Sequence, residues 1–228
     1  MALTLIDGTA ALIVFGGTVL ATVLRSGFAE VGATLRALRR AWGPHYSADA
    51  GKAELAPQVR EIRREGLLRA TPRKLDDREL AEATEALFHT RSIEALVKAH
   101  ARHREARRAE AETGVRVLAQ ASELAPVFGM AGTLVALNRM PGELATGDAV
   151  TGAIGMAVVT TLYGILAANL VLAPLARWVE RAAEREERER QVVIDWLSEQ
   201  VGGALPPGRE PRPDARSDTR ADHHRRVA

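Results

Sequence analysis

A few hydroxyl and acidic side chains lie in or next to apolar stretches of the sequence, and these residues are the first candidates for chemistry. Thr133 and Thr161 lie inside uncharged stretches, and their hydroxyls can bond water or a carboxylic acid in either protonation state. Glu123 lies at the start of the stretch that contains Thr133. An ion path through hydrocarbon needs a titratable or hydrated group. Because no acidic residue lies near the middle of an apolar stretch, the carboxylate of any such path must come from a partner.

Prolines and small residues accompany these threonines. Pro126 and Pro174 remove backbone hydrogen bonds and permit bends, which could change with protonation and couple it to conformation. Small residues at four further positions would let two membrane helices approach closely: Gly129, Gly132, Gly164 and Ala168.

Each of these residues also has a plainer interpretation. Threonine and glycine in membrane helices serve packing more often than conduction, and Thr18 is interpreted as a packing residue. Thr160 should point away from the direction of Thr161, since neighbours on a helix differ by about 100°. Glu123 is either an ion exit group at the cytoplasmic mouth or a carboxylate favoured at a helix start. Asp7 is interpreted as an N-cap.

Charge is distributed unevenly along the 228 residues. No charged residue occurs from Ala149 to Ala176, which exceeds the roughly 20 residues that a helix needs to cross a bilayer. Further uncharged runs cover Gly8–Leu24 and Leu124–Asn138. The sequence therefore predicts an all-α integral membrane protein with three transmembrane helices, over 1–24, 117–140 and 149–176.

Basic residues set the expected orientation. Arginines follow the first span, precede the second and follow the third, whereas the loop over 141–148 and its approach contain only Arg139. By the positive-inside rule the N-terminus lies outside, the helical insertion over 25–116 is cytosolic, and 141–148 is a periplasmic loop. A cytosolic helical extension over 177–204 and a disordered Pro- and Arg-rich tail over 205–228 complete the predicted organisation.

The insertion is predicted to be helical. Helical periodicity covers 27–42, 55–69 and 78–111, with residues 45–53 as a loop. The third span is expected to continue into the extension without a break, up to Gly202-Gly203.

Several classes of function find no support in the sequence. The chain has no cysteine, its net charge is only +2 at pH 7, and it shows no phosphate-binding loop or nucleophile motif. His100-x-x-His103 lies in a basic surface helix and is not interpreted as a metal site, and the histidines of the tail are interpreted as solvated. We therefore expect no catalytic residues, no cofactor, no metal and no nucleic acid.

Four segments together resemble the MotA/TolQ/ExbB proton-channel family. They are LIDGTAALIVFGGTVLATVL, VREIRREGLL, APVFGMAGTLVAL and VVTTLYGILAANLVLAPLARWVE, in this order. The first two are most similar to the MotA flagellar-stator branch. MotA-like chains usually have another membrane helix before the Gly-Gly-Thr helix, so this chain is either a three-span member or has its start codon placed too late. They also often carry a Glu shortly after Gly-Leu-Leu, where this chain has Arg69-Ala70-Thr71.

The resemblance implies a multi-pass protein of the bacterial inner membrane, in contact with lipid. Its partner would be a MotB-like single-span protein that supplies a membrane Asp, enclosed by a pentamer of this chain around two partner helices. Thr133 and Thr161 would line the path of H⁺ or Na⁺. Arg63 and Arg64 would contact a flagellar rotor protein, or alternatively form a solvated helix face. The runner-up functions are a TolQ/ExbB-like energiser of envelope transport or maintenance and a passive helical scaffold.

Overall fold

The structure, a computed structural model, describes residues 8–67, 69–138 and 147–203. Its helices in chain order are α1 (Gly8–Ala11), the π-helix η1 (Leu12–Gly16), α2 (Gly17–Trp42), α3 (Ala48–Glu65), α4 (Arg78–Thr90), α5 (Ile93–Asn138), α6 (Gly147–Leu166), the π-helix η2 (Ala167–Leu172) and α7 (Ala173–Gly202). Every regular element in the described ranges is a helix, so the all-α prediction is confirmed there.

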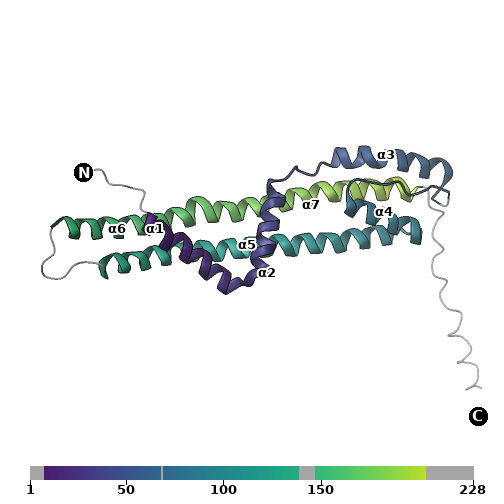
Figure 1. Ribbon diagram of the computed structural model, residues 1–228. Helices are drawn as coiled ribbons and strands as arrows, with labels where there is room; N and C mark the ends of the chain where they lie inside the picture. The colour runs from purple at the N-terminus through teal and green to yellow at the C-terminus, as the bar shows by residue number, and fades with distance from the viewer. Residues whose placement is uncertain (1–7, 68, 139–146, 204–228) are drawn as a thin grey trace, which may run out of the picture.

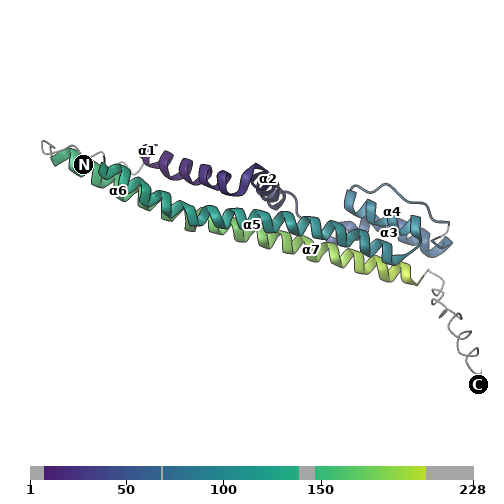
Figure 2. The same ribbon diagram turned by 90° about the horizontal axis from the view of Figure 1, so that it is seen from below.

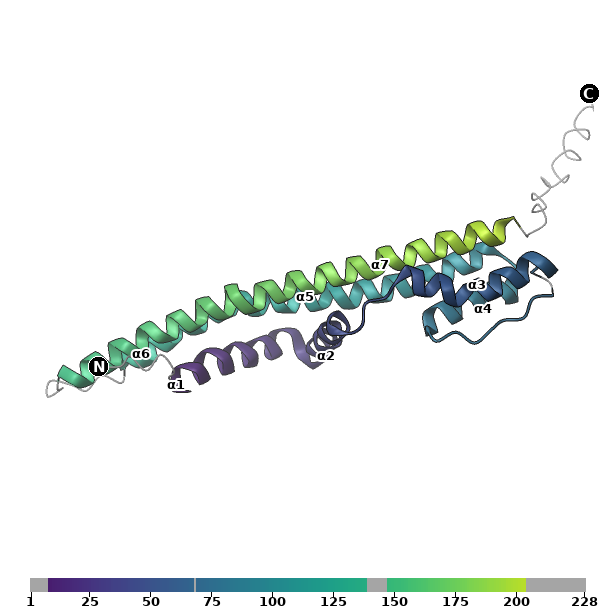
Figure 3. The same ribbon diagram turned by 90° about the horizontal axis from the view of Figure 1, so that it is seen from above.

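Two long helical rods form the frame of the molecule. One rod is α5, and the other is the continuous line of α6, η2 and α7 that runs beside it (Figure 1). Helices α1, α2, α3 and α4 all lie on one side of this pair (Figures 2 and 3). One half of the pair is apolar and the other is rich in charge, so the rods have two ends of different chemistry.

Two helices among the described residues are long and apolar enough to cross a membrane, namely Gly8–Trp42 and the helix from Val150 to Gly202. Only 17% and 28% of their most apolar windows are buried, whereas the core helix of a soluble protein would be mostly buried. The predicted span over 117–140 lies in α5 as far as Asn138, beyond which the structure does not describe it, and it is not among the two. The polar residues Ser122 and Glu123 lower the mean hydropathy of this stretch, so a third span is not established.

The second half of α2 runs across the two rods (Figures 1 and 2). The change of direction occurs at Gly27, whose φ of 77° and ψ of 161° are not helical. A side chain at this φ would be strained, which is why glycine serves here. The crossing part ends at Trp42, whose ring packs edge-on against Trp178 of α7 at a centroid distance of 4.7 Å.

Helices α3 and α4 pack against the charge-rich ends of the rods and enclose the largest apolar core (Figure 3). Its fully buried members include Leu55, Ile62, Leu87, Leu96, Ile194 and Leu197. The expected single helix over 78–111 was wrong, because α4 ends at Thr90 and α5 begins at Ile93. Arg91 adopts a left-handed conformation at φ 55° and donates its N–H to the Leu87 carbonyl, which closes the helix end.

The expected loop over 45–53 was also partly wrong, since α3 already begins at Ala48. The Ala48 N–H donates to the Glu189 carboxylate of α7 at 2.8 Å, and an anion stabilises a helix start. The predicted loop over 141–148 falls largely, and the tail over 205–228 entirely, outside the described residues. Asp7 and Arg139 also lie outside them.

Three glycines bring the backbones of α5 and α6 together in what we call the small-residue seam: Gly129, Gly132 and Gly164. A Cβ on Gly164 would lie 2.6 Å from the Ala125 carbonyl oxygen, and one on Gly129 would lie 3.0 Å from the Thr160 carbonyl oxygen. Both neighbours are backbone atoms, so no side-chain rotation can relieve the overlap. The seam therefore fixes the separation of the two helices.

Replacing Gly164 by Ala should force α5 and α6 apart and destabilise the protein by about 1–3 kcal/mol, the usual cost of overpacking. Gly155→Ala on the same helix is the matched control, because a Cβ there would meet nothing within 4 Å. Thermal unfolding of both variants in detergent gives the comparison. Equal stability of the two variants would show that the seam does not set the helix separation.

Candidate functional site

The two predicted hydroxyl residues lie along the seam, one on each of its helices. Thr161 lies beside Gly129, since a Cβ on Gly129 would be 3.3 Å from the Thr161 Cα. Thr133 follows Gly129 by four residues, and such residues share a helix face. Both threonines are half-buried, so they lie at the edge of the seam and not in its interior.

Each hydroxyl bonds a carbonyl of its own helix. The Thr133 hydroxyl donates to Met130 O at 2.6 Å, and the Thr161 hydroxyl donates to Ala157 O at 3.3 Å. These bonds use the donor of each hydroxyl but leave lone pairs that can accept from water or an acid. The two side chains can therefore take part in a hydrated path without first breaking a contact between helices.

Thr160 occupies a different place from its neighbour. It is fully buried, and its side chain fills the seam against Gly132, where an added Cβ would lie 2.8 Å from the Thr160 Cβ. Its hydroxyl donates to Ala157 O at 2.9 Å. Thr160 thus packs α5 and α6 together, whereas the half-buried Thr161 remains accessible from outside the helix pair.

The two prolines lie at irregular or crowded points of the rods. Pro126 is inside α5 and half-buried, with its Cα 3.1 Å from the position of a Cβ on Gly164. Pro174 is the second residue after η2, and a π-helix widens the turn where a proline cannot donate an N–H. Buried Ala168 lies within η2, and its carbonyl accepts from the Ser122 hydroxyl at 3.1 Å. This bond ties the widened turn to α5.

Glu123 is exposed on α5, three residues before Pro126. Its role as an ion exit group stays a prediction. Glu123 does not fit a helix-start carboxylate, because α5 begins thirty residues earlier, at Ile93. The sequence left both interpretations open, because it does not show where α5 begins.

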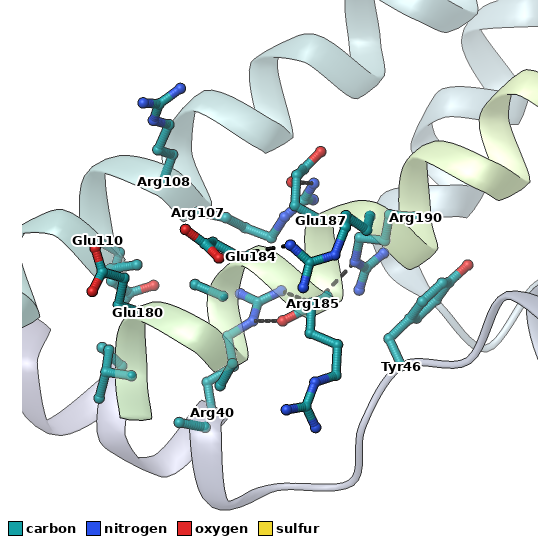
Figure 4. A pocket seen from close by; sticks show the side chains of 18 of the residues that line it. Arg40, Tyr46, Arg107, Arg108, Glu110, Glu180, Glu184, Arg185, Glu187 and Arg190 are labelled. Carbon is teal, nitrogen blue, oxygen red and sulfur yellow. Dashed lines mark hydrogen bonds and ion pairs between the residues drawn. The ribbon is translucent and has the colours of Figure 1, made fainter. Parts of the chain in front are cut away.

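A cluster of ion pairs, most of them largely buried, joins four helices in the charge-rich half (Figure 4). Arg190 of α7 is its centre and pairs with Asp77 and with Glu186, both at 2.9 Å. Arg107 of α5 pairs with Glu79 of α4 and with Glu187 of α7. Arg40 of α2 pairs with Glu186 at 2.8 Å, so every helix around the cluster contributes a charge.

The charge cluster lines a cavity of about 970 Å³ between α2, α5 and α7. Arg190 also lies over the Tyr46 ring, 4.2 Å from its centroid, so one face of the guanidinium is covered. Both arginines and glutamates line the walls, among them Glu180, Glu184 and Arg185 (Figure 4). This mixed charge does not indicate a site for one anion or one cation, and we interpret the cluster as a structural joint.

Burial and pairing set the protonation of the cluster. Burial raises the pKa of Asp77, but hydrogen bonds from Arg190 and from the Leu80 N–H outweigh it and hold the pKa below its usual value. Asp77 is therefore charged at neutral pH. Burial lowers the pKa of His100, so this side chain is neutral beside Glu187.

Arg63 and Arg64 are exposed in the last turn of α3. Figure 1 places this turn at the end of the molecule opposite to α6. The chain then turns at Gly66, with φ 79°, and Glu61 accepts from the Thr71 N–H at 3.2 Å. The two arginines therefore lie at a tip of the molecule far from the seam.

Sequence reasoning missed the charge cluster. The relevant signal was the density of Arg and Glu in residues 77–79 and 186–190, but periodicity does not say which charges meet. No group of His, Asp or Glu that could hold a metal ion occurs among the residues that the structure describes.

A family model described as the MotA/TolQ/ExbB proton channel family matches residues 72–192. Motility protein A of Cereibacter sphaeroides is 36% identical over 75 residues, which cover 33% of this chain. The matched part is only 30% of that relative's own length, so the chain spans less than a third of it.

Two solved structures share the fold. The structure of C. jejuni MotAB has a TM-score of 0.77 at 20% identity, covering 89% of this chain and 80% of the other. The flagellar MotAB stator complex from Bacillus subtilis has a TM-score of 0.74 at 25% identity, covering 87% of this chain and 80% of the other.

The charge cluster predicts unequal effects of two substitutions at Asp77. Asp77 is the N-cap of α4 and accepts from the Leu80 N–H at 3.0 Å. Asp77→Asn keeps an acceptor at the cap but removes the charge that faces Arg190, whereas Asp77→Ala removes both. Hydrogen exchange of the α4 amides should therefore be faster in the Asn variant than in the wild type. It should be faster again in the Ala variant, whose free energy of opening should be lower by a further ~1 kcal/mol, the usual contribution of an N-cap. Equal exchange in Asn and wild type would show that the pairing does not hold α4.

Proposed function

The chain belongs to the MotA/TolQ/ExbB proton channel family, and we propose that it is the MotA-like subunit of an ion-driven membrane motor. The observation that carries the proposal is the pair of half-buried hydroxyls, Thr133 and Thr161, at the edge of the small-residue seam. They lie in apolar stretches without an acidic residue. A carboxylate on another chain must therefore complete an ion path at this edge.

The partner in this proposal is a MotB-like protein whose single membrane helix supplies an Asp. Copies of this chain would surround that helix as a ring, a pentamer as the family implies, with the edge of the seam facing inward. The Thr133 and Thr161 hydroxyls then line the path beside the Asp, and Glu123 lies at its cytoplasmic mouth. The threonines can serve H⁺ or Na⁺, and the description of the family favours H⁺.

The proposed placement is the bacterial inner membrane. The apolar halves of the rods and the first half of α2 cross the membrane, with 117–140 as a third span inside α5. The charge-rich halves, α3 and α4 lie in the cytosol, and the N-terminus lies outside. The support for this arrangement is the arginine-rich boundary of each apolar stretch.

Conversion of ion flow into rotation needs a rigid connection between the seam and the rotor. We assign this connection to the rods, because α5 and α6–η2–α7 run without a break from the seam to α3 and α4. Pro126 and the widened turn before Pro174 are the proposed points where protonation of the partner's Asp changes the bend. The tip with Arg63 and Arg64 would then push on an acidic rotor surface.

The alternative function is a TolQ/ExbB-like energiser. The likeness to the MotAB stator complex over most of the chain favours the motor subunit. Co-purification distinguishes the two: the motor subunit should retain a MotB-like partner, and retention of a TolR- or ExbD-like partner instead would favour the energiser.

Thr161→Val should abolish ion flux while leaving assembly intact. Valine keeps the shape of threonine and deletes the hydroxyl, so we expect flux to fall at least about tenfold, which corresponds to about 1.4 kcal/mol of barrier. Flux is measured as acidification of cells that carry a deregulated partner, and assembly as co-purification. Thr161→Ser should retain much of the flux.

The matched control is Thr160→Val, one residue away. Thr160 packs inside the seam, so loss of its hydroxyl should leave flux near the wild-type level. Wild-type flux in Thr161→Val, or equal loss in both variants, would contradict the assignment of Thr161 to the path.

Reversing both charges at the tip, in Arg63→Glu/Arg64→Glu, should abolish motility without changing membrane level or partner binding. A single exposed pair contributes only about 0–1 kcal/mol, so the double variant is needed. Lys98→Glu/Arg102→Glu on the exposed face of α5 gives the same change of net charge on a different helix. Normal swimming at high load in the tip variant would contradict a rotor contact.

A further inference from the structure

A buried histidine lies where α5 and α7 meet, and the proposed function does not use it. His100 of α5 is 8% exposed, and Leu96, four residues before it on the same face, belongs to the largest apolar core. The His100 Nε2 atom lies 3.6 Å from Glu187 Oε1 of α7. Both atoms are buried, and neither has a hydrogen-bond partner among the described residues. A buried polar group without a partner is costly, so this contact costs stability where the two helices meet.

Glu187 is shared among three basic side chains of α5. Its Oε2 atom accepts from Arg107 at 2.7 Å, and its Oε1 atom lies 3.4 Å from Arg104 Nε. His100, Arg104 and Arg107 are spaced by four and three residues, which places them in one row along the helix. A positive charge on His100 would therefore have to compete with two arginines for one carboxylate.

Helix α4 also packs against α5, and its acidic side chains are engaged with other groups. Glu79 pairs with Arg107 and with Arg190. Glu82 lies 2.9 Å from the Nε2 atom of His103, the half-buried histidine three residues further along α5. Neither carboxylate is therefore available to neutralise a charge on the buried ring.

Burial decides the protonation of His100. It outweighs the attraction of Glu187 and the hydrogen bond with Gln191, and Arg104 and Arg190 also repel the charged ring. The pKa of His100 in the closed joint therefore lies below the usual histidine value of 6.5. In an open state, where water reaches the ring, the proton binds more readily. The stability of the joint is therefore complete above about pH 6.5, and it is lost as the pH falls below this value.

We propose that His100 is an acid-sensitive switch, whose protonation opens the junction of α4, α5 and α7 at the charge-rich end of the rods. The charged ring moves out to water, and Glu187 stays with Arg104 and Arg107. The small-residue seam at the other end keeps its packing. With the charge-rich half in the cytosol, acidification there would loosen the connection between the seam and the tip. This last consequence rests on the proposed function, whereas the switch itself does not.

Hydrogen exchange at pH 7.5 and 5.5, corrected for the intrinsic exchange rate, tests the switch. The full chain, with any partner that co-purifies, is measured in nanodiscs by mass spectrometry. We expect the protection of peptides over 93–107 and 187–201 to fall by up to about tenfold at pH 5.5, the limit for a ring that binds its proton only in the open state. Asp77 and Glu186 contribute little in this range, because their pairing with Arg190 keeps the pKa of each carboxyl below its usual value.

Two substitutions of the histidine should remove the effect of pH. Neither glutamine nor phenylalanine titrates, so His100→Gln and His100→Phe should each give the same protection at pH 5.5 as at pH 7.5. Glutamine keeps a polar group and phenylalanine keeps a ring, so one variant serves if the other disturbs the fold. The matched control is His103→Gln on the same helix, which should keep the wild-type fall because His103 is less buried and lies beside Glu82.

Three results would overturn the proposal. Equal protection of the wild type at both pH values would exclude the switch without the use of any variant. A fall that persists in a folded variant of His100 would assign the effect of pH to another group, as would a fall that His103→Gln removes. An equal fall in peptides over the seam would mean general unfolding of the protein instead of a local opening.

Discussion

The close approach of two backbones at the small-residue seam is the constraint on which the rest of the structure depends. In lipid, apolar side chains gain little by leaving one apolar neighbour for another, so helices associate through close packing. Gly129 and Gly164 allow backbone atoms of α5 and α6 to meet directly. That approach fixes which residues are enclosed and which remain at the edge, and it thereby distinguishes Thr160 from Thr161.

The charge cluster has the corresponding role at the other end of the rods. A buried ion pair contributes little net stability compared with apolar packing, but removal of one partner is costly because the other charge stays buried. Arg190 pairs with residues of α4 and α7 at once, and Glu186 connects it to α2. The cluster therefore specifies how four helices meet, while the apolar core around Leu55 and Leu197 supplies the stability.

The sequence was sufficient for some of these features and not for others. The uncharged stretch over 149–176 and the continuous helical pattern after it are local signals, and the resemblance to the family was confirmed by the match over residues 72–192. The break at Arg91 could not be predicted, because the left-handed turn there uses arginine where a glycine usually gives the signal. The pairing of Arg190 with Asp77 joins residues far apart in the sequence, and only the tertiary structure brings them together. For the candidate site, the resemblance to the family favoured Thr133 and Thr161 as path residues, and helix geometry separated Thr160 from Thr161. The contact of Thr160 with Gly132 could not be predicted, because it depends on how α5 and α6 pack.

The π-helix η2 has a consequence for how the chain tolerates change in length. It lies between the seam and the charge cluster on a single continuous helix, and it holds one more residue per turn than an α-helix would. An α-helix has 3.6 residues per turn, so one deletion in α7 between Pro174 and Glu186 would rotate everything after it by about 100° relative to everything before it. One deletion within Ala167–Leu172 would instead convert the wide turn into an α-helical turn and keep the two ends of the helix in phase. After the deletion in α7, the glycines of α6 would keep their phase against α5, while Arg190 and Glu186 would face away from their partners. In a helix that carries two separate patterns, the spacing between the patterns is as much a fixed property as the residues that compose them.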